Sequence, residues 1–467
     1  MKKLTIGLLI LTLTIGFGVS FSSQSLADSH GDVEEVTLKA IGGLSSPYAR
    51  VNYVGPDVAD LDLAKKETSE EFFNSYALIS YNNANPDKEV YLDTFIPPFT
   101  DLQKEQMLAL TSGQPYDFLV MDAQWIGQYA EGGYLKDDYS ESYKEWAEEY
   151  GMYESFKKGS TYKDKMYGIW RETSTRALWV WKDVLHAAGY TMEDIESAEG
   201  LVEALPDIKE TAEEEFDMSG AMEYRYDGDV ALDWWYGWLY QLGGSIAERN
   251  EDGEWRAGFD NEAGYEAANY LKELDEAGAD LKRTWQSNLV NFLNRDYAMT
   301  FSGSWAVSNI NQHFSSKDPS EYDEEVGMIP QPTFEGKQMR TLTGGFSMVI
   351  PESAQHPDLV HEILMEHLFR ADNNYALHLA KNGLFPTSEK IFQNPIYEEE
   401  MLKSMPEEWY EKYNKAVSGG VVRPGIPEYS RIKDILWEGV ESVVSGQSTA
   451  EKALSEAANE VNDLLED

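Results

Sequence analysis

The chain has 467 residues, of which 42% are hydrophobic and 13% aromatic, and it contains no cysteine. This composition supports large folded cores and excludes both a disulfide framework and a cysteine-ligated metal site. Asp and Glu number 83 against 38 Lys and Arg, so the formal net charge of −45 excludes nucleic acid and anionic lipid as partners by repulsion.

The N-terminal segment has the pattern of a secretory signal peptide. A short basic start precedes a nearly apolar run from Leu4 to Val19, and small residues stand at Ser25 and Ala27, the positions that a signal peptidase recognises. We expect residues 1–27 to be removed and the mature chain to begin near Asp28. An uncleaved membrane anchor is the alternative, and the apolar run is shorter than the ~20 residues that span a bilayer.

The absence of cysteine also removes the attachment point of a lipoprotein anchor. We therefore expect a protein that is periplasmic, or loosely held outside the cell. The strong acidity favours adaptation to high salt, where repulsion between surface carboxylates is screened over a few ångströms. An ordinary acidic exported protein from a low-salt organism is the alternative.

Strand-like and helix-like segments alternate along the chain, which predicts an α/β fold. A chain of this length exceeds one core and predicts two lobes or more. Strands are expected at residues 36–40, 118–121, 177–181, 298–301 and 346–350. Helices are expected over residues 260–277 and 358–369 and after residue 450. Ser448 and Glu451 have the spacing of a capping box in front of the last helix.

No catalytic or metal signature fits the chain. His361 and His367 lie six positions apart, whereas chelation from one helical face needs a spacing of four. Gly345 to Val349 lacks the second glycine of a nucleophile elbow. No carboxylate pair is marked out for glycoside hydrolysis among so many acids. We expect no catalytic residue, no metal and no cofactor.

The tryptophans are the most informative side chains. Trp125 follows a predicted buried strand and stands near Asp122, Trp305 ends another strand, and a dense cluster runs from Asp233 to Trp238. Flat aromatic rings cover the apolar faces of sugars, while Asp, Glu, Arg and Asn bond to the hydroxyls. We expect Trp125 and Trp305 to contact a ligand, and one or two rings of the cluster to do so while the others pack in the core.

A Ser-Gly-x-Pro turn at residues 112–115 leads into a strand that ends in Asp122 and Trp125, and this block resembles family 1 extracellular solute-binding proteins. These are the binding components of ABC sugar importers, similar to maltose-binding proteins. The resemblance runs in order from Val36 to Leu465. The five blocks are Ser112–Leu135, Tyr167–Asp183, Ala298–Trp305, Val326–Gly345 and Arg423–Leu454.

The resemblance implies the two-lobe periplasmic-binding-protein fold, an α/β fold with hinge-connected lobes and a central ligand cleft. It places chain crossings near residues 171–175, 340–345 and 394. The N-lobe would comprise residues 33–172 with 343–394, and the C-lobe residues 173–342 with 395–467.

The resemblance also implies a function without covalent chemistry. A sugar, with a di- or oligosaccharide favoured by the many aromatics, enters an open cleft, and the lobes close about the hinge. The closed monomer then docks on an ABC transporter permease in the membrane. The ligand-binding residues implied by matching blocks, or by lying beside them, are Asp122, Trp125, Arg171, Glu172, Trp234, Trp235, Trp305, Gly344, Gly345, Phe346 and Arg423.

Some features depart from the family pattern or leave alternatives open. The segment Ser45–Asn85 is unusually long, and its Tyr48, Arg50 and Asn52 would line or cap the cleft. Arg431, Ile432 and Lys433 replace an aromatic expected after Pro427, which argues against maltose itself. Gly344 and Gly345 either approach the ligand or form a tight turn. A polyamine or osmolyte binder of the same fold and a secreted glycan-active enzyme are the competing hypotheses.

Overall fold

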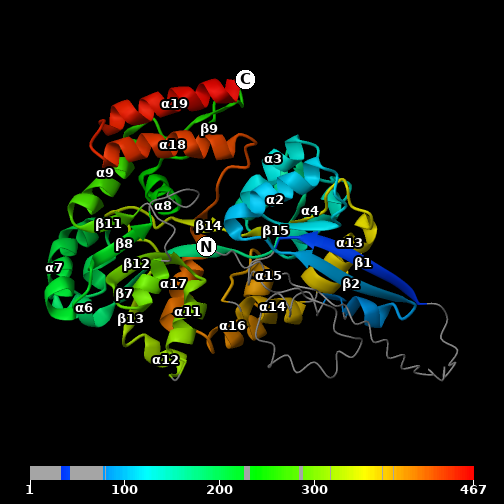
Figure 1. Ribbon diagram of the computed structural model, residues 1–467, viewed down its shortest axis with the longest axis horizontal. Coiled ribbons are helices and arrows are strands. Elements are labelled where there is room, and N and C mark those ends of the chain that lie inside the picture. Colours follow the sequence, from blue (N-terminus) through cyan, green and yellow to red (C-terminus); the bar gives the residue numbers. More distant parts are fainter. Residues whose placement is uncertain are drawn as a thin grey trace, which may run out of the picture.

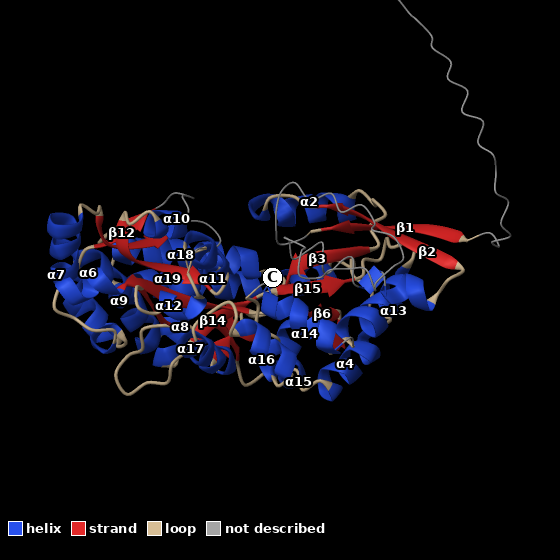
Figure 2. Cartoon of the chain, turned by 90° about the horizontal axis from the view of Figure 1, so that it is seen from below, coloured by secondary structure: helices blue, strands red, loops and turns tan. Residues whose placement is uncertain are grey.

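The computed structural model describes residues 33–42, 77–225, 232–282 and 288–466, apart from residues 79, 316, 371 and 382. The expected signal peptide lies outside the described residues, as do Tyr48, Arg50 and Asn52. Two sheets with their surrounding helices lie side by side along the long axis of the molecule (Figure 1). Figure 2 shows the same two parts from below.

The first sheet has five strands in the order β2-β1-β3-β15-β6. Its first three strands are parallel, and β15 is antiparallel to both of its neighbours. In β1 the buried side chains alternate with exposed ones, whereas every residue of β3 is buried, as expected for an edge-proximal and a central strand. The strands are β1 Glu34–Ile41, β2 Lys88–Phe95, β3 Phe118–Asp122, β6 Gly168–Trp170 and β15 Phe346–Val349.

The second sheet has seven strands in the order β11-β8-β12-β7-β14-β16, with β13 also paired to β7. The central β7 is antiparallel to β12, β13 and β14. The strands are β7 Ser174–Trp181, β8 Gly220–Arg225, β11 Ala279–Lys282, β12 Tyr297–Gly303, β13 Val326–Ile329, β14 Thr341–Gly344 and β16 Gly420–Val421. Two small ladders join β4 Thr161–Tyr162 to β5 Lys165–Met166, and β9 Ala247–Arg249 to β10 Trp255–Ala257.

The chain passes between the sheets three times, and the first two passages are neighbours. Strand β6 belongs to the first sheet and β7 to the second, and only Arg171, Glu172 and Thr173 separate them. Strand β14 belongs to the second sheet and β15 to the first, and Gly345 alone separates these two. Two short connections that run together between two cores are the arrangement of a hinge.

Helices cover both sheets. Those before β6, with those between β15 and residue 401, are α2 Phe99–Thr111, η3 Ala123–Trp125, α3 Ile126–Glu131, α4 Ser140–Glu149, α5 Glu154–Gly159, α13 Pro357–Glu362, η6 Ile363–Phe369, α14 Asp372–Lys381, α15 Glu389–Phe392 and α16 Pro395–Met401. The others are α6 Lys182–Ala187, η4 Glu193–Ile195, α7 Ala198–Phe216, α8 Asp233–Leu242, α9 Glu262–Glu276, α10 Asn288–Leu293, α11 Ala306–His313, α12 Pro319–Tyr322, α17 Glu407–Ser418, α18 Tyr429–Val444 and α19 Ala450–Glu466. Helices α18 and α19 pack on each other and on α9.

Two predicted helices differ in detail from the structure. The helix expected over residues 358–369 is α13 followed by the wider π-type turns of η6. The cap of α19 is Thr449 rather than Ser448, because Thr449 Oγ1 accepts the backbone hydrogen bond of Lys452 at 3.4 Å. The hydroxyl of Ser448 is buried without a partner among the described residues. Thr449 thus takes the N-cap role that the capping-box pattern assigned one position earlier.

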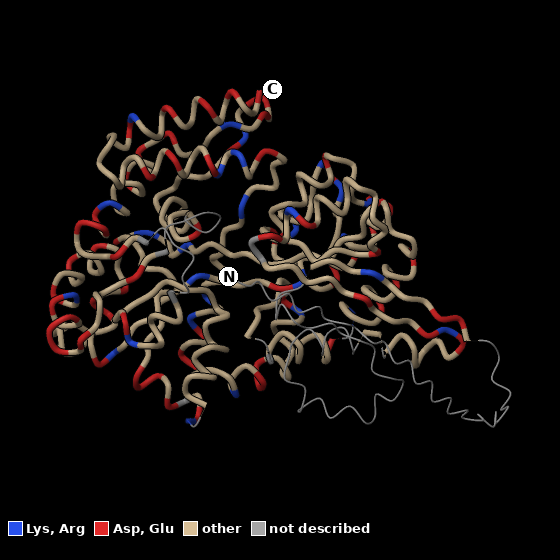
Figure 3. Tube along the Cα trace, in the orientation of Figure 1, with Lys and Arg blue, Asp and Glu red and all other residues tan. Residues whose placement is uncertain are grey.

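The acidic residues lie mainly on the outer helices and end loops, along α7 and α19 among others (Figure 3). Within the described part of the chain, no helix is both long and apolar enough to span a membrane.

Candidate functional site

A carboxylate stands at the end of β3, where the first sheet faces the second. Asp122 is the last residue of this strand, and its side chain accepts a hydrogen bond from the backbone nitrogen of Gln124 at 3.2 Å. This bond caps the short turn η3, which ends at Trp125. Trp125 stacks on Tyr129 with ring centroids 6.4 Å apart and is 5% exposed, so its ring is mostly packed inside the protein and offers little surface to a ligand.

A buried arginine interrupts the apolar strand β7 of the second sheet. Arg176 donates from Nη2 to Oδ2 of Asp233, the first residue of α8, at 2.5 Å. Its guanidinium carbon lies 5.6 Å from the ring centroid of Trp234 and 5.0 Å from that of Trp305. The guanidinium is therefore positioned by a carboxylate and by two indole faces at once.

A second arginine binds the other oxygen of the same carboxylate. Arg423, which follows β16, donates from Nη2 to Oδ1 of Asp233. Burial alone raises the pKa of Asp233, but the attraction of Arg423 and Arg176 outweighs it, so the pKa lies below its usual value. Burial alone lowers the pKa of Arg423, but the charges of Asp233, Tyr429 and Asp122 and the hydrogen bond to Asp233 together outweigh it, so the pKa is raised. Asp233 and Arg423 are thus both ionised near neutral pH.

Asp122, on the first sheet, is a fourth charged group near Arg176, Asp233 and Arg423. Burial raises the pKa of its carboxyl group, and the nearby Asp233 adds to this effect. The charges of Arg423 and Arg176 and the hydrogen bond from Gln124 oppose it only in part. Arg423, Arg176 and Asp233 are thus close enough to Asp122 to influence its pKa, and neither arginine forms an ion pair with it.

Trp305 supplies an exposed flat surface beside these charges. It is 43% exposed, in contrast to Trp234 at 4%. Its ring lies against the backbone of Gly303, because a Cβ placed on that glycine would be 1.9 Å from the ring. One face of the indole is therefore supported by β12, and the side chain remains accessible to a ligand.

Gly344, the last residue of β14, borders both arginines. A Cβ on Gly344 would lie 3.4 Å from Nη1 of Arg423 and 3.8 Å from Nη2 of Arg176. Its carbonyl accepts a hydrogen bond from Oγ1 of Thr173 at 3.1 Å, which ties the first two connections between the sheets together. Glycine at this position thus lets both guanidinium groups approach the backbone without contacting a side chain.

The structure brings together five of the residues expected in the site, and it adds two. Asp122, Trp234, Trp305, Gly344 and Arg423 surround Arg176 and Asp233. Phe346 pairs with Asp122 in the sheet register and is 9% exposed, so it lies at the edge of this group.

Other expected residues have different surroundings. Arg171 and Glu172 form a buried ion pair with each other within the first connection between the sheets. Gly345 packs against that connection, because a Cβ there would lie 1.9 Å from the carbonyl oxygen of Glu172. Trp235 is fully buried in the core. These positions support the hinge and the core rather than an accessible surface.

Sequence reasoning missed Arg176 and did not include Asp233 among the site residues. A signal for the arginine was present, because a charged residue inside an apolar strand is rarely buried without a partner. The partner lies 57 positions later in the chain, so no local pattern could identify it.

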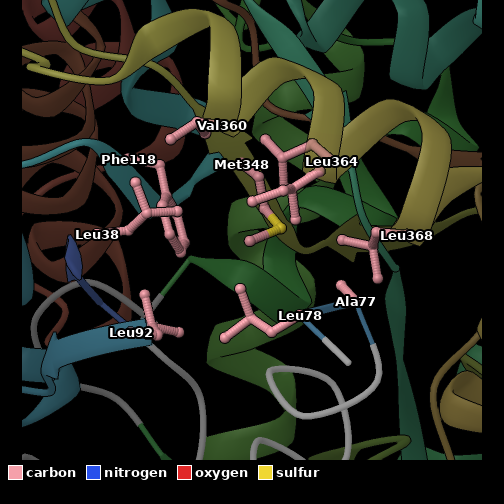
Figure 4. Close-up of a pocket in the computed structure, with 10 residues that line it drawn as sticks. Leu38, Ala77, Leu78, Leu92, Phe118, Met348, Val360, Leu364 and Leu368 are labelled. Atoms are coloured by element: carbon pink, nitrogen blue, oxygen red, sulfur yellow. The ribbon is translucent and has the colours of Figure 1, made fainter. Parts of the chain in front are cut away.

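Neither the histidine pair nor the apolar cavity forms a competing site. The ring of His361 stacks on Tyr139 with centroids 4.2 Å apart, and His367 shares a hydrogen bond with Ser80 at 2.8 Å. Among the described residues, no group of three or more potential metal ligands lies together. Figure 4 shows an apolar cavity inside the first part, which lacks polar groups to orient a solute. Its volume is about 30 Å³, far below that of a site for a sugar. Its lining is Leu38, Ala77, Leu78, Leu92, Phe118, Met348, Val360, Ile363, Leu364 and Leu368.

Comparison with protein families agrees with this geometry. The family described as "Bacterial extracellular solute-binding protein" matches residues 78–404, more than half of the chain. The chain belongs to this family of bacterial extracellular solute-binding proteins. The resemblance noted in the sequence to extracellular solute-binding proteins is thereby confirmed.

Solved structures similar to this solute-binding protein share its fold along nearly the whole chain. The GacH receptor of Streptomyces glaucescens, determined unliganded and with acarbose, has 19% sequence identity and a TM-score of 0.70, over 93% of this chain and 99% of that one. The cyclic α-maltosyl-1,6-maltose binding protein of Arthrobacter globiformis has 17% identity and a TM-score of 0.69, over 92% and 98%. An ABC substrate-binding protein of Listeria monocytogenes in complex with cycloalternan has 18% identity and a TM-score of 0.67, over 93% and 99%.

These similarities confirm the predicted fold. The solute-binding protein has the α/β, two-lobe architecture of periplasmic sugar-binding proteins. The charged group around Asp233 and the exposed Trp305 lie beside the connections between the two sheets.

Proposed function

We propose that this protein captures a carbohydrate outside the cytoplasm and delivers it to the permease of an ABC transporter. The lobes would be residues 33–172 with 343–394, and residues 173–342 with 395–467, after removal of residues 1–27. The protein acts by binding alone, as a monomer, without catalysis and without a cofactor.

The observation that carries the proposal is the combination of Trp305 with buried charged groups. Trp305 is 43% exposed, and Arg176, which is held by Asp233, lies 5.0 Å from its ring centroid. A sugar needs a flat apolar surface for its C–H face and positioned donors and acceptors for its hydroxyls. Asp122 on the opposite sheet would supply the acceptor across the cleft.

The contacts of the segment that contains Arg423 support the proposal that the lobes close on a ligand. This residue bonds to Asp233, and two positions later the carbonyl of Gly425 packs against α3, since a Cβ on Gly127 would lie 2.6 Å from it. In Figure 1 the chain that leads into α18 runs between the two parts. A ligand that bonds to Arg423 and to Asp122 together would favour the closed arrangement by differential affinity for it.

The related structures support a sugar as the solute. The relatives described above were determined with acarbose or cycloalternan, or are named for a cyclic maltosyl-maltose ligand. These ligands belong to those proteins. The aromatic and hydrogen-bonding groups in the present cleft would serve a saccharide in the same way.

A thermal-shift and calorimetric screen of residues 28–467 at high salt tests the proposal. The panel would hold mono- and oligosaccharides, with spermidine and glycine betaine as representatives of other solutes. A ligand at 100 times its Kd should add about 2.7 kcal/mol to the free energy of unfolding. Trp305→Ala should abolish the shift caused by a sugar.

Trp255→Ala is the matched control, because Trp255 also stacks with an arginine, Arg249 at 4.4 Å, but lies on β10 away from the cleft. A shift only with betaine or spermidine would replace the sugar by that solute. Release of reducing ends from mixed glycans, lost on substitution of a single carboxylate, would overturn the assignment as a binding protein.

A further inference from the structure

The two buried arginines in the cleft carry more hydrogen-bond donors than the protein satisfies. Each guanidinium has five N–H donors. In the described part of the chain, Arg423 donates to Asp233, and Arg176 donates to Asp233 and, at 3.4 Å, to Ser174. Their side chains are each 7% exposed, and none of their remaining nitrogens is among the buried atoms without a partner, so water reaches these donors when no solute is bound. A solute that displaces this water must supply acceptors, because donors left without partners on burial are costly.

The two guanidinium groups converge beside Gly344. A Cβ on this glycine would lie 3.4 Å from Nη1 of Arg423 and 3.8 Å from Nη2 of Arg176, so both groups approach the same backbone position. A group with two oxygens on one carbon can accept from two guanidinium edges at once, which a single hydroxyl does less well.

The charges beside Gly344 do not cancel within the second sheet. Arg176 and Arg423 share the single carboxylate of Asp233, which leaves one positive charge uncompensated. Asp122 on the first sheet makes no ion pair with either arginine, and burial raises the pKa of its carboxyl group. With Asp122 ionised the four groups carry no net charge, whereas protonation of Asp122, which burial favours, leaves a net positive group for an anionic solute.

The position of Trp305 defines where the anion must sit on the solute. The guanidinium of Arg176 lies 5.0 Å from the centroid of this ring. Because Arg176 lies over part of this indole, a sugar ring on the exposed remainder of the indole places a substituent next to this guanidinium. In a uronic acid, that substituent is a carboxylate in place of the neutral hydroxymethyl group.

We propose that the solute is an acidic carbohydrate, with a uronic-acid ring on Trp305 and its carboxylate held by Arg423 and Arg176. This inference rests on the carbohydrate function proposed above and specifies the charge of the sugar. The acidic surface does not oppose it, because surface repulsion is screened beyond about 8 Å at physiological salt, whereas the buried contact is not.

Isothermal titration calorimetry with matched sugar pairs tests the inference. The pairs are D-galacturonate with D-galactose, D-glucuronate with D-glucose, and digalacturonate with the corresponding neutral dimer. We expect the acidic member of at least one pair to bind tenfold or more tightly than its neutral partner. Equal or tighter binding of the neutral member in every pair would overturn the acidic-sugar inference and leave the carbohydrate function standing. Binding of no sugar at all would overturn both.

Two variants test the roles of the charges. Asp122→Asn removes a negative charge from the cleft while its amide oxygen still accepts the bond from Gln124, so the acidic sugar should bind several-fold more tightly. Weaker binding of the acidic sugar by this variant would contradict the inference. Arg423→Lys keeps the charge but loses the planar fork, and should weaken the acidic sugar at least tenfold and the neutral sugar less.

The matched controls are exposed residues outside the cleft. Asp183→Asn and Arg295→Lys change side chains that are 52% and 36% exposed, and neither should alter the ratio of affinities. The unfolding midpoint of each ligand-free variant shows whether it folds. If Arg423→Lys does not fold, the result for Asp122→Asn decides.

Discussion

The carboxylate of Asp233 accepts a hydrogen bond from the guanidinium of Arg423, a residue 190 positions later in the chain. Its second oxygen is bound to Arg176 at 2.5 Å. The side chains of the three residues are between 2% and 7% exposed. One buried acid therefore positions two arginines that come from a central strand and from the segment before α18.

Replacement of Asp233 should destabilise the fold strongly. Asp233→Asn removes the negative charge that is bonded to two buried guanidinium groups, and loss of one partner of such a buried pair costs about 3–5 kcal/mol. The free energy of unfolding, measured by urea denaturation, should fall by that amount. Asp183→Asn breaks an Arg–Asp pair of similar length, 2.6 Å, with side chains 36% and 52% exposed, and should cost less than about 1 kcal/mol. Equal effects of the two substitutions would show that the buried group does not stabilise the fold.

Asp122→Asn should raise the free energy of unfolding, in contrast to Asp233→Asn. Burial raises the pKa of Asp122 in the folded protein above the value of about 3.9 expected in the unfolded chain. The folded state therefore binds the proton more tightly, and stability is lost as pH rises through the window between the two values. Asparagine removes that loss, so the variant should be more stable than the wild type at pH 7, and the difference should vanish below pH ~4.

Urea denaturation of both proteins between pH 3 and pH 8 measures this difference. The titratable and charged groups that face Asp122 are Arg423, Asp233, Arg176, Tyr129 and Lys433. A variant less stable than the wild type at pH 7 would mean that the attraction of the arginines outweighs burial at this carboxylate.

The sequence predicted the elements that carry a local signal. The strands at β1, β3, β7, β12 and β15 and the helices α9 and α19 were expected because apolar residues recur with the period of each structure. The family blocks predicted the two-lobe fold, which the similar structures confirm.

The roles of neighbouring residues could not be separated from the sequence. Trp234 and Trp235 are adjacent on α8, yet Trp234 lies beside Arg176 and Trp235 lies in the core, because consecutive helical residues point in different directions. Gly344 and Gly345 are adjacent too, and only the packing around them distinguishes an ordinary contact from a tight one. Such differences depend on contacts between distant parts of the chain, which have no local pattern.

The two adjacent glycines should respond differently to alanine. In Gly345→Ala the new Cβ would lie 1.9 Å from the backbone oxygen of Glu172, which cannot move without shifting the connection between the sheets. We expect a loss of at least ~1–3 kcal/mol in the free energy of unfolding, as for other overpacked sites. In Gly344→Ala the nearest atoms are guanidinium nitrogens at 3.4 Å and 3.8 Å, so the fold should be retained while the affinity for the sugar falls. Thermal unfolding and calorimetric titration of both variants separate these outcomes, and a stable Gly345→Ala protein would contradict the packing argument.

The stability of the whole protein should depend on salt through its acidic surface. With 83 Asp and Glu against 38 Lys and Arg, repulsion between carboxylates opposes the compact state at low ionic strength. The Debye length falls from about 10 Å at 0.1 M to about 3 Å at 1 M, so added salt should progressively relieve this repulsion. We expect the thermal midpoint to keep rising in potassium chloride up to about 2 M, measured without ligand by circular dichroism. Chloride is preferable to sulfate, because sulfate also strengthens apolar burial. A midpoint that stops rising below about 0.5 M would instead favour an ordinary acidic protein from a low-salt environment.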